Sequence, residues 1–322
     1  MQVLVVSDLH WAGPAEQQRR GFEQAVIGDP LQRLLASAWR KGFWLADPLA
    51  HNHRLDRIIE RNPSPDVVVA NGDYTVDSAF IGLADDPACE SAGLCLQRLR
   101  EAYRERLLVG IGDHELGKHS FLGGAGGPRF ESWRRVGERL GIEPMWRRNF
   151  GRFAFVAVPS TPMALPAFEP ELLPGERALW HALRERLVAQ VRGLFAGIPE
   201  DRRIVLFCHD PTALPFLAEL PEVAAALPRF DATVIGHLHS PFLFGVARRL
   251  AGFPEVRNFG STMRRYTTAL RQASTWKRFR IVFCPSPTGA ERLKDGGWLT
   301  GDFEPDSAEP IEWTRHRLPW NA

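Results

Sequence analysis

Short runs of aliphatic residues recur along the chain, and each of them ends in a polar turn. Runs of four to six aliphatic and β-branched residues without alternation are typical of strands that are buried on both faces of a sheet. We therefore predict strands at these positions. The runs are QVLVV (2–6), DVVVA (66–70), RLLVGI (106–111), RIVLF (203–207) and ATVI (232–235).

Helical patterns lie between these runs. In the longest of them, Leu183, Leu187 and Val191 form an apolar stripe. The alternation of strand and helix predicts an α/β fold in which helices cover the faces of a sheet. The helical patterns span residues 55–61, 96–106, 131–140 and 178–194, and further strand-like runs are RFAFVAVP (152–159), EVRNFG (255–260) and FRIVFCP (279–285).

Three segments depart from the alternation. Residues 11–50 form a long insertion with an amphipathic stretch at 29–45, which could cap a site, bind a partner or pack on the core. Residues 118–129 are rich in glycine, and we expect them to be mobile. The tail from about residue 290 is rich in Gly, Pro, Asp and Trp, and we expect it to be irregular. Since we find no linker, we predict a single domain over residues 1–322.

Charge is nearly balanced, with 40 basic and 38 acidic residues, so no general attraction to nucleic acid or to an anionic membrane is expected. Residues 263–280 mix arginine with aromatic residues. We expect a solvated hairpin there, with contact to an anionic polymer or lipid as the alternative. The start of the chain lacks a basic leader, and no apolar run approaches the ~20 residues of a membrane span. We expect a cytoplasmic protein in which Cys208 and Cys284 belong to the core.

Aspartate and histidine stand directly after five of the predicted strands. Both residue types are good ligands for Zn²⁺, Mn²⁺ or Fe²⁺. In an open α/β sheet, the carboxyl ends of the strands converge on a common crevice, so these side chains are expected to meet there. They are Asp8 and His10, Asp73, Asp113 and His114, His209, and His237 and His239.

Five short motifs carry a resemblance to a known family. DLH, NGD, GDHE, CHDP and GHLH resemble, in order and spacing, the motif blocks of the calcineurin-like metallophosphoesterases, over roughly residues 2–262. The resemblance implies a four-layer αββα sandwich with two metal ions at the strand ends. One ion would bind Asp8, His10 and His239, the other would bind Asp113, His209 and His237, and Asp73 would bridge them. His114 would face the substrate as a phosphate contact or a general acid.

The implied activity is the two-metal hydrolysis of a phosphomonoester, phosphodiester or pyrophosphate bond in a small molecule. Two ions ~4 Å apart can hold phosphoryl oxygens and lower the pKa of a bridging water. Protonation of the leaving oxygen by His114 would be worth roughly 10²- to 10⁴-fold. We expect two divalent transition-metal ions, Mn²⁺ first and Fe or Zn as alternatives. The competing hypotheses are a nuclease of the same fold, against which the near-neutral charge argues, and a metal-poor binding scaffold without activity.

The sequence departs from the family pattern at Asp113, where an asparagine is usual. An aspartate changes the charge of the ligand set from −2 to −3 against the +4 of two divalent ions. We expect Asp113 to bind metal, with a turn toward a nearby arginine as the alternative. Asp77, four residues after Asp73, is expected in a turn or behind the ligands.

Overall fold

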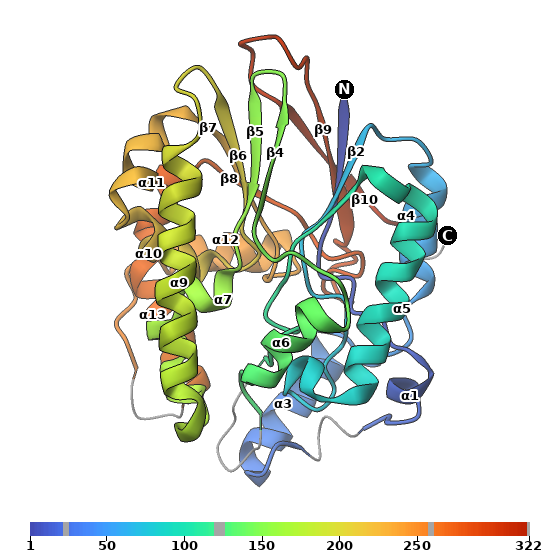
Figure 1. The fold of residues 1–322 in the computed structure, drawn as a ribbon. Coiled ribbons are helices and arrows are strands. Elements are labelled where there is room, and N and C mark those ends of the chain that lie inside the picture. Colours follow the sequence, from blue (N-terminus) through green and yellow to red (C-terminus); the bar gives the residue numbers. More distant parts are fainter. Residues whose placement is uncertain (22–25, 119–125, 257–260, 321–322) are drawn as a thin grey trace.

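Two five-stranded sheets lie face to face at the centre of the structure, a computed structural model that describes residues 1–21, 26–118, 126–256 and 261–320 (Figure 1). In the first sheet the strands β1 (Gln2–Val6), β2 (Val67–Ala70) and β3 (Leu107–Val109) are parallel. The sheet continues with β9 (Gly297–Asp302), which is antiparallel to β1, and β10 (Glu312–Arg317), which is antiparallel to β9. The strand order is β10-β9-β1-β2-β3.

The second sheet has the order β4-β5-β6-β7-β8. Its strands β5 to β8 are parallel, and β4 pairs with β5 in the antiparallel sense. The bounds are β4 (Trp146–Phe150), β5 (Phe153–Ala157), β6 (Arg203–Phe207), β7 (Phe230–Ile235) and β8 (Ile281–Phe283).

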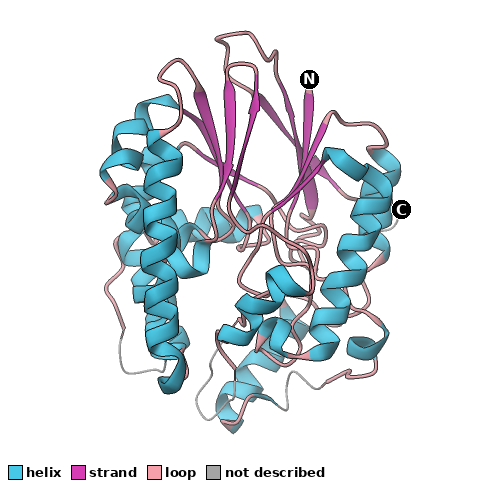
Figure 2. Cartoon of the chain, in the orientation of Figure 1, coloured by secondary structure: helices cyan, strands magenta, loops and turns pink. Residues whose placement is uncertain are grey.

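Helices cover the outer face of each sheet, which completes four layers and confirms the predicted αββα sandwich (Figure 2). On one side lie α4 (His53–Arg61) and α5 (Asp86–Tyr103), and on the other side lie α9 (Arg177–Ala196), α10 (Leu214–Ala218) and α11 (Pro221–Ala226). The other helices are α1 (Pro14–Gln17), α3 (Pro30–Gly42), α6 (Phe130–Glu138), α7 (Ser160–Met163), α8 (Leu165–Phe168), α12 (Pro241–Arg249) and α13 (Ser261–Gln272).

Alternate residues of the central strands belong to two different cores. Val3 and Val5 of β1 pack between the sheets, in a cluster that also holds Phe155 of β5, whereas Leu4 and Val6 pack under the helices. This period of two explains why the runs are apolar throughout, because both faces of each strand are covered. The prediction of strands buried on both faces is confirmed for β1, β2, β6 and β7, whereas the three residues of β3 are only partly buried.

Two expectations about the second half of the chain are wrong. Residues 263–280 form most of α13 and a 3₁₀ segment (Ala273–Phe279) rather than a hairpin, and Trp276 is buried there. The tail is not irregular, because β9 and β10 extend the first sheet and Leu299 lies between the sheets. The expected strand at 255–260 and the glycine-rich segment at 118–129 fall largely on residues 257–260 and 119–125, which lie outside the described residues.

Candidate metal centre

The loops after five strands meet at one end of both sheets, and they carry the predicted side chains to one place (Figure 1). Within the described part of the chain, two groups of acidic and histidine side chains lie close enough to hold an ion. In each group the candidate ligand atoms are within 4.8 Å of one another, and Asp73 belongs to both. The groups are Asp8, His10, Asp73 and His239, and Asp73, Asp113, His209 and His237.

Short distances tie the members of each group together. In the first, Nε2 of His239 lies 3.2 Å from Oδ1 of Asp8 and 3.1 Å from Nε2 of His10. In the second, Nε2 of His209 lies 3.0 Å from Oδ2 of Asp73. These two groups are the ligand sets that the family resemblance implies for two metal ions.

Buried polar atoms without hydrogen bonds point into these groups. Among the described residues, Oδ1 of Asp8, Oδ2 of Asp73 and Nε2 of His209 are buried and make no hydrogen bond, and their close contacts are ion pairs with other members of the two groups. A buried polar atom left in this state costs about 1–3 kcal/mol, so several of them in one place call for a ligand. Carboxylate oxygens with imidazole nitrogens form a donor set that suits divalent transition metals. The residues fit a dinuclear divalent metal site, while the role of each single ligand stays a prediction.

The histidine rings are oriented by backbone carbonyls behind them. Nδ1 of His209 lies 2.8 Å from the carbonyl oxygen of Asn71, and Nδ1 of His10 lies 3.2 Å from that of Thr75. An imidazole that donates its Nδ1 proton to a carbonyl keeps a lone pair on Nε2. Burial lowers the pKa of His209, but Asp73 and Asp8 outweigh it and raise this pKa well above its usual value, so a metal ion would displace the second ring proton of His209 when it binds.

The backbone at the centre is held in an unusual conformation. Five of the predicted ligands have positive φ angles, between 46° and 62°. Aspartate and histidine tolerate this left-handed region better than most residues, but it still costs roughly 1–3 kcal/mol at each position, and such strain clusters at functional sites. The five are Asp8, His10, Asp73, His237 and His239.

Two glycines let the loops approach one another. A Cβ atom at Gly112 would lie 2.0 Å from Oδ1 of Asp73, and one at Gly236 would lie 2.4 Å from Oδ2 of Asp8. Side chains cannot be accommodated at these distances, because the atoms in the way belong to the two candidate ligands and, at Gly236, also to Ser7, whose Oγ would lie 2.1 Å away. The glycines of the GDHE and GHLH motifs are therefore required by close packing around the two carboxylates.

Glu115 is an important residue to which the sequence analysis gave no role. Its buried carboxylate accepts the backbone N–H groups of Gly112, Asp73 and Tyr74 at 2.8, 2.9 and 2.7 Å. The carboxylate thus joins the turn after β2 to the turn after β3. Burial, followed by repulsion from Asp73, raises the pKa of Glu115 to about 7. The position of Glu115 in the GDHE motif is the sequence feature from which its role could have been predicted.

The family profile that matches the chain is that of the calcineurin-like phosphoesterases, over residues 1–241. The chain belongs to this family. Among curated proteins, no sequence relative is found.

Three solved structures share a distant likeness with this phosphoesterase. A Staphylococcus aureus protein assigned as a 5'-nucleotidase, solved with alpha-ketoglutarate, is 11% identical to this chain at a TM-score of 0.41. The match covers 99% of this chain and 54% of the Staphylococcus aureus protein, so this chain spans about half the length of that protein. A dimetal phosphatase from Danio rerio is 13% identical at a TM-score of 0.44, and the match covers 99% of this chain and 97% of the phosphatase. Phosphopantetheinyl hydrolase from Mycobacterium tuberculosis is 17% identical at a TM-score of 0.32, and the match covers 74% of this chain and 83% of the hydrolase.

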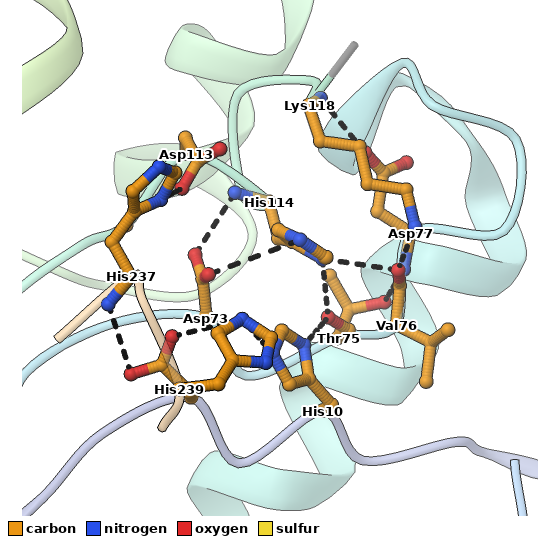
Figure 3. Close-up of polar contacts among 12 residues, drawn as sticks. His10, Asp73, Thr75, Val76, Asp77, Asp113, His114, Lys118, His237 and His239 are labelled. Carbon is orange, nitrogen blue, oxygen red and sulfur yellow. Dashed lines mark hydrogen bonds and ion pairs between the residues drawn. The ribbon is translucent and has the colours of Figure 1, made fainter. Parts of the chain in front are cut away.

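Asp113, at the position where the family usually has asparagine, faces the histidines of the second group (Figure 3). Its Oδ1 lies 2.8 Å from Nδ1 of His237 and 3.5 Å from Nε2 of His209. Burial alone would raise the pKa of Asp113, but the neighbouring His237 and His209 outweigh it and hold the pKa well below its usual value. The carboxylate is thus ionised and directed at the centre, and within the described ranges its ion pairs go to histidines.

His114 lies at the edge of the two groups without belonging to either (Figure 3). Its Nδ1 is 3.2 and 3.0 Å from the carbonyl oxygens of Thr75 and Val76, and its Nε2 is 3.9 Å from Oδ2 of Asp73. Burial, and then the neighbouring His10 and Lys118, hold the pKa of His114 well below its usual value. The ring is therefore neutral at pH 7, with Nε2 facing the centre.

Lys118 and Asp77 support this edge from behind. Nζ of Lys118 donates to the carbonyl of Val76 at 2.9 Å and lies 4.4 Å from the centre of the Phe80 ring. Asp77 accepts the backbone N–H groups of Gly82 and Lys118 at 2.8 and 3.1 Å. Asp77 thus lies in a turn behind the candidate ligands, as expected.

Proposed function

We propose that the protein hydrolyses a phosphoester or pyrophosphate bond of a small phosphorylated molecule, with two divalent transition-metal ions and Mn²⁺ as the first choice. The observation that carries the proposal is the pair of buried groups that share Asp73 and contain polar atoms without hydrogen-bond partners. When bound, two such ions would neutralise phosphoryl oxygens and lower the pKa of a water molecule between them. Asp8, His10 and His239 would hold one ion, Asp113, His209 and His237 the other, and Asp73 both.

The protein's own residues position these groups. Asp73 directs one carboxylate at both ligand groups, and its Oδ1 is fixed by the backbone N–H of His114 at 2.9 Å. The imidazole of His114 is fixed at Nδ1 by two carbonyls, so its Nε2 stays on the substrate side of Asp73. It would contact a phosphoryl oxygen or, once protonated, give its proton to the leaving oxygen.

The remaining parts of the proposal concern organisation and location. We treat residues 1–322 as one domain, because β9 near the end of the chain pairs with β1 at its start and with β10 on its other side. All four cysteines are unpaired and buried, which suits a reducing compartment and supports a cytoplasmic location. No helix in the described ranges is long and apolar enough to cross a membrane.

The test is Asp73→Asn, compared with wild type by metal analysis and by hydrolysis of a panel of phosphomonoesters, phosphodiesters, cyclic nucleotides and nucleotide-diphosphate sugars in Mn²⁺. The variant is expected to bind less than two ions per chain and to lose turnover, because one residue serves both groups. Asp56→Asn is the matched control, since Asp56 lies in an ion pair with Arg98 on the surface. Near-wild-type activity in Asp73→Asn would refute the shared-ligand site. Two bound ions in wild type without hydrolysis of any substrate would favour the non-catalytic scaffold.

A further inference from the structure

Helix α3, in the insertion at residues 11–50, carries an apolar face that the rest of the protein leaves in solvent. None of its thirteen residues is buried. Leu31, Leu34, Leu35 and Trp39 are 63, 66, 60 and 50% exposed, and their spacing places them on one side of the helix. Because isolated helices of this length are marginal in water, such a face normally gains its stability from something that covers it.

The apolar face continues into the metal centre through a series of aromatic rings. The ring of Trp39 lies 4.7 Å from that of Phe43, and the neighbouring Trp44 lies 4.7 Å from the ring of His239. Phe43 also lies 6.2 Å from Phe242, which is 53% exposed at the start of α12. Leu31, Leu35, Trp39, Phe43 and Trp44, which we name the α3 track, thus connect solvent with a predicted metal ligand.

Positive charge lies beside the track. A cavity of about 550 Å³ at the C-terminal end of α3 is lined by four basic residues and one acidic residue, besides Phe43 and Trp320. The basic residues are Arg40, Lys41, Arg292 and Lys294; the acidic one is Glu291, whose carboxylate accepts the N–H of Ala46. Two hydrogen bonds join the end of α3 to the opposite wall of the cavity. The backbone N–H of Glu291 donates to the carbonyl oxygen of Trp44 at 2.7 Å, and Nε of Arg292 donates to the carbonyl oxygen of Gly42 at 3.1 Å. An anionic group would be attracted here while an apolar chain lies on the track.

We infer that the substrate is an amphiphilic phosphoester: its alkyl chain lies along the α3 track, its anionic group faces the basic cavity, and its phosphoester bond reaches the metal centre. This inference rests on the proposed function and names the substrate class. A second copy of the chain on the track is the alternative occupant that the test examines.

The test measures binding of non-hydrolysable alkylphosphonates, from butyl to decyl, to the Mn²⁺-loaded protein by calorimetry below their micelle concentrations. A fully buried methylene changes affinity about fourfold, and one covered from one side about twofold. Wild type is therefore expected to bind decylphosphonate roughly 60-fold more tightly than butylphosphonate. The double variant Leu35→Gln/Trp39→Gln should reduce this ratio to below about tenfold. Leu179→Gln, at a leucine of α9 that is 48% exposed, should keep this ratio.

Three results would overturn the inference. They are an affinity in wild type that does not change with chain length, a ratio that the double variant leaves intact, and a dimer in sedimentation velocity that Leu35→Gln abolishes. The phosphonate titration does not require turnover. A protein that shows the chain-length dependence but hydrolyses no phosphoester would refute the proposed function alone, and a flat dependence with active hydrolysis would refute the substrate class alone.

Discussion

Glu115 offers the sharpest test of how the two central turns are held. In Glu115→Ala, three buried backbone N–H groups lose their only acceptor among the described residues, those of Gly112, Asp73 and Tyr74. Each such loss costs about 1–3 kcal/mol, and water that enters the vacated space recovers part of it. We expect the free energy of unfolding to fall by about 3–5 kcal/mol.

Glu115→Gln should lie between wild type and the alanine variant. The amide keeps one acceptor oxygen, but its NH₂ group must face a backbone N–H donor. The raised pKa of Glu115, about 7, shows that burial and the charge of Asp73 already disfavour the carboxylate, so removal of its charge offsets part of this loss. The order of stability is therefore wild type, glutamine, alanine.

The assay is urea unfolding followed by circular dichroism at pH 7.5, in EDTA and again with Mn²⁺. Glu90→Ala is the control, since Glu90 is exposed on α5 and its removal should change stability by less than about 0.5 kcal/mol. If Glu115→Ala stays within 1 kcal/mol of wild type, the carboxylate does not hold the turns. Should the alanine variant fail to fold, the glutamine variant carries the comparison.

Three further predictions concern the centre and its surroundings. His114→Ala should keep its metal ions but slow hydrolysis by roughly 10²- to 10⁴-fold, more for alkyl than for nitrophenyl esters; equal slowing of both would exclude leaving-group protonation. Asp113→Asn should bind the second ion somewhat more weakly and Asp113→Ala should not retain it at ordinary Mn²⁺ concentrations, which metal analysis across a Mn²⁺ titration would detect; two ions of unchanged affinity in the alanine variant would show that Asp113 is no ligand. His51→Gln should reduce acid destabilisation. Burial, and then the charges of Arg54 and His53, lower the pKa of His51 to about 4, so its contribution to stability is present above pH 6.5 and is lost as the pH falls toward 4. After allowance for its partial exposure we expect a difference of about 1–2 kcal/mol between the urea unfolding curves of the two proteins at pH 4, and none at pH 7.5.

The sequence allowed the position of the candidate site to be predicted because strand runs and their polar ends are local features. The run before Asp73 and the run before His209 each identify a strand end, and parallel strands bring those ends together. The division into two sheets did not follow from the runs. It came from the resemblance to the family, and the structure confirms it.

Other features depend on contacts between distant residues, which a local pattern does not contain. Residues 297–302 hold two glycines and were expected to be irregular, yet they form β9 because β1 and β10 pair with them on both sides. The hydrogen bond from Asp73 to Glu115 joins residues 42 positions apart. The exposed face of α3 was visible as an amphipathic pattern, but whether it packed on the core could be decided only by the structure.

A second buried carboxylate completes the support of the centre, and it comes from the insertion. Glu16 accepts the hydroxyl of Thr75 at 3.0 Å and both the N–H and the hydroxyl of Ser78 at 2.9 and 3.0 Å. These bonds fix the loop whose carbonyls orient His10 and His114. The strained Asp73 therefore lies between two clamps, Glu115 at its own N–H and Glu16 on the loop that follows. Because each clamp satisfies three donors that would otherwise be buried without partners, release of the strained turn would cost more than the strain itself.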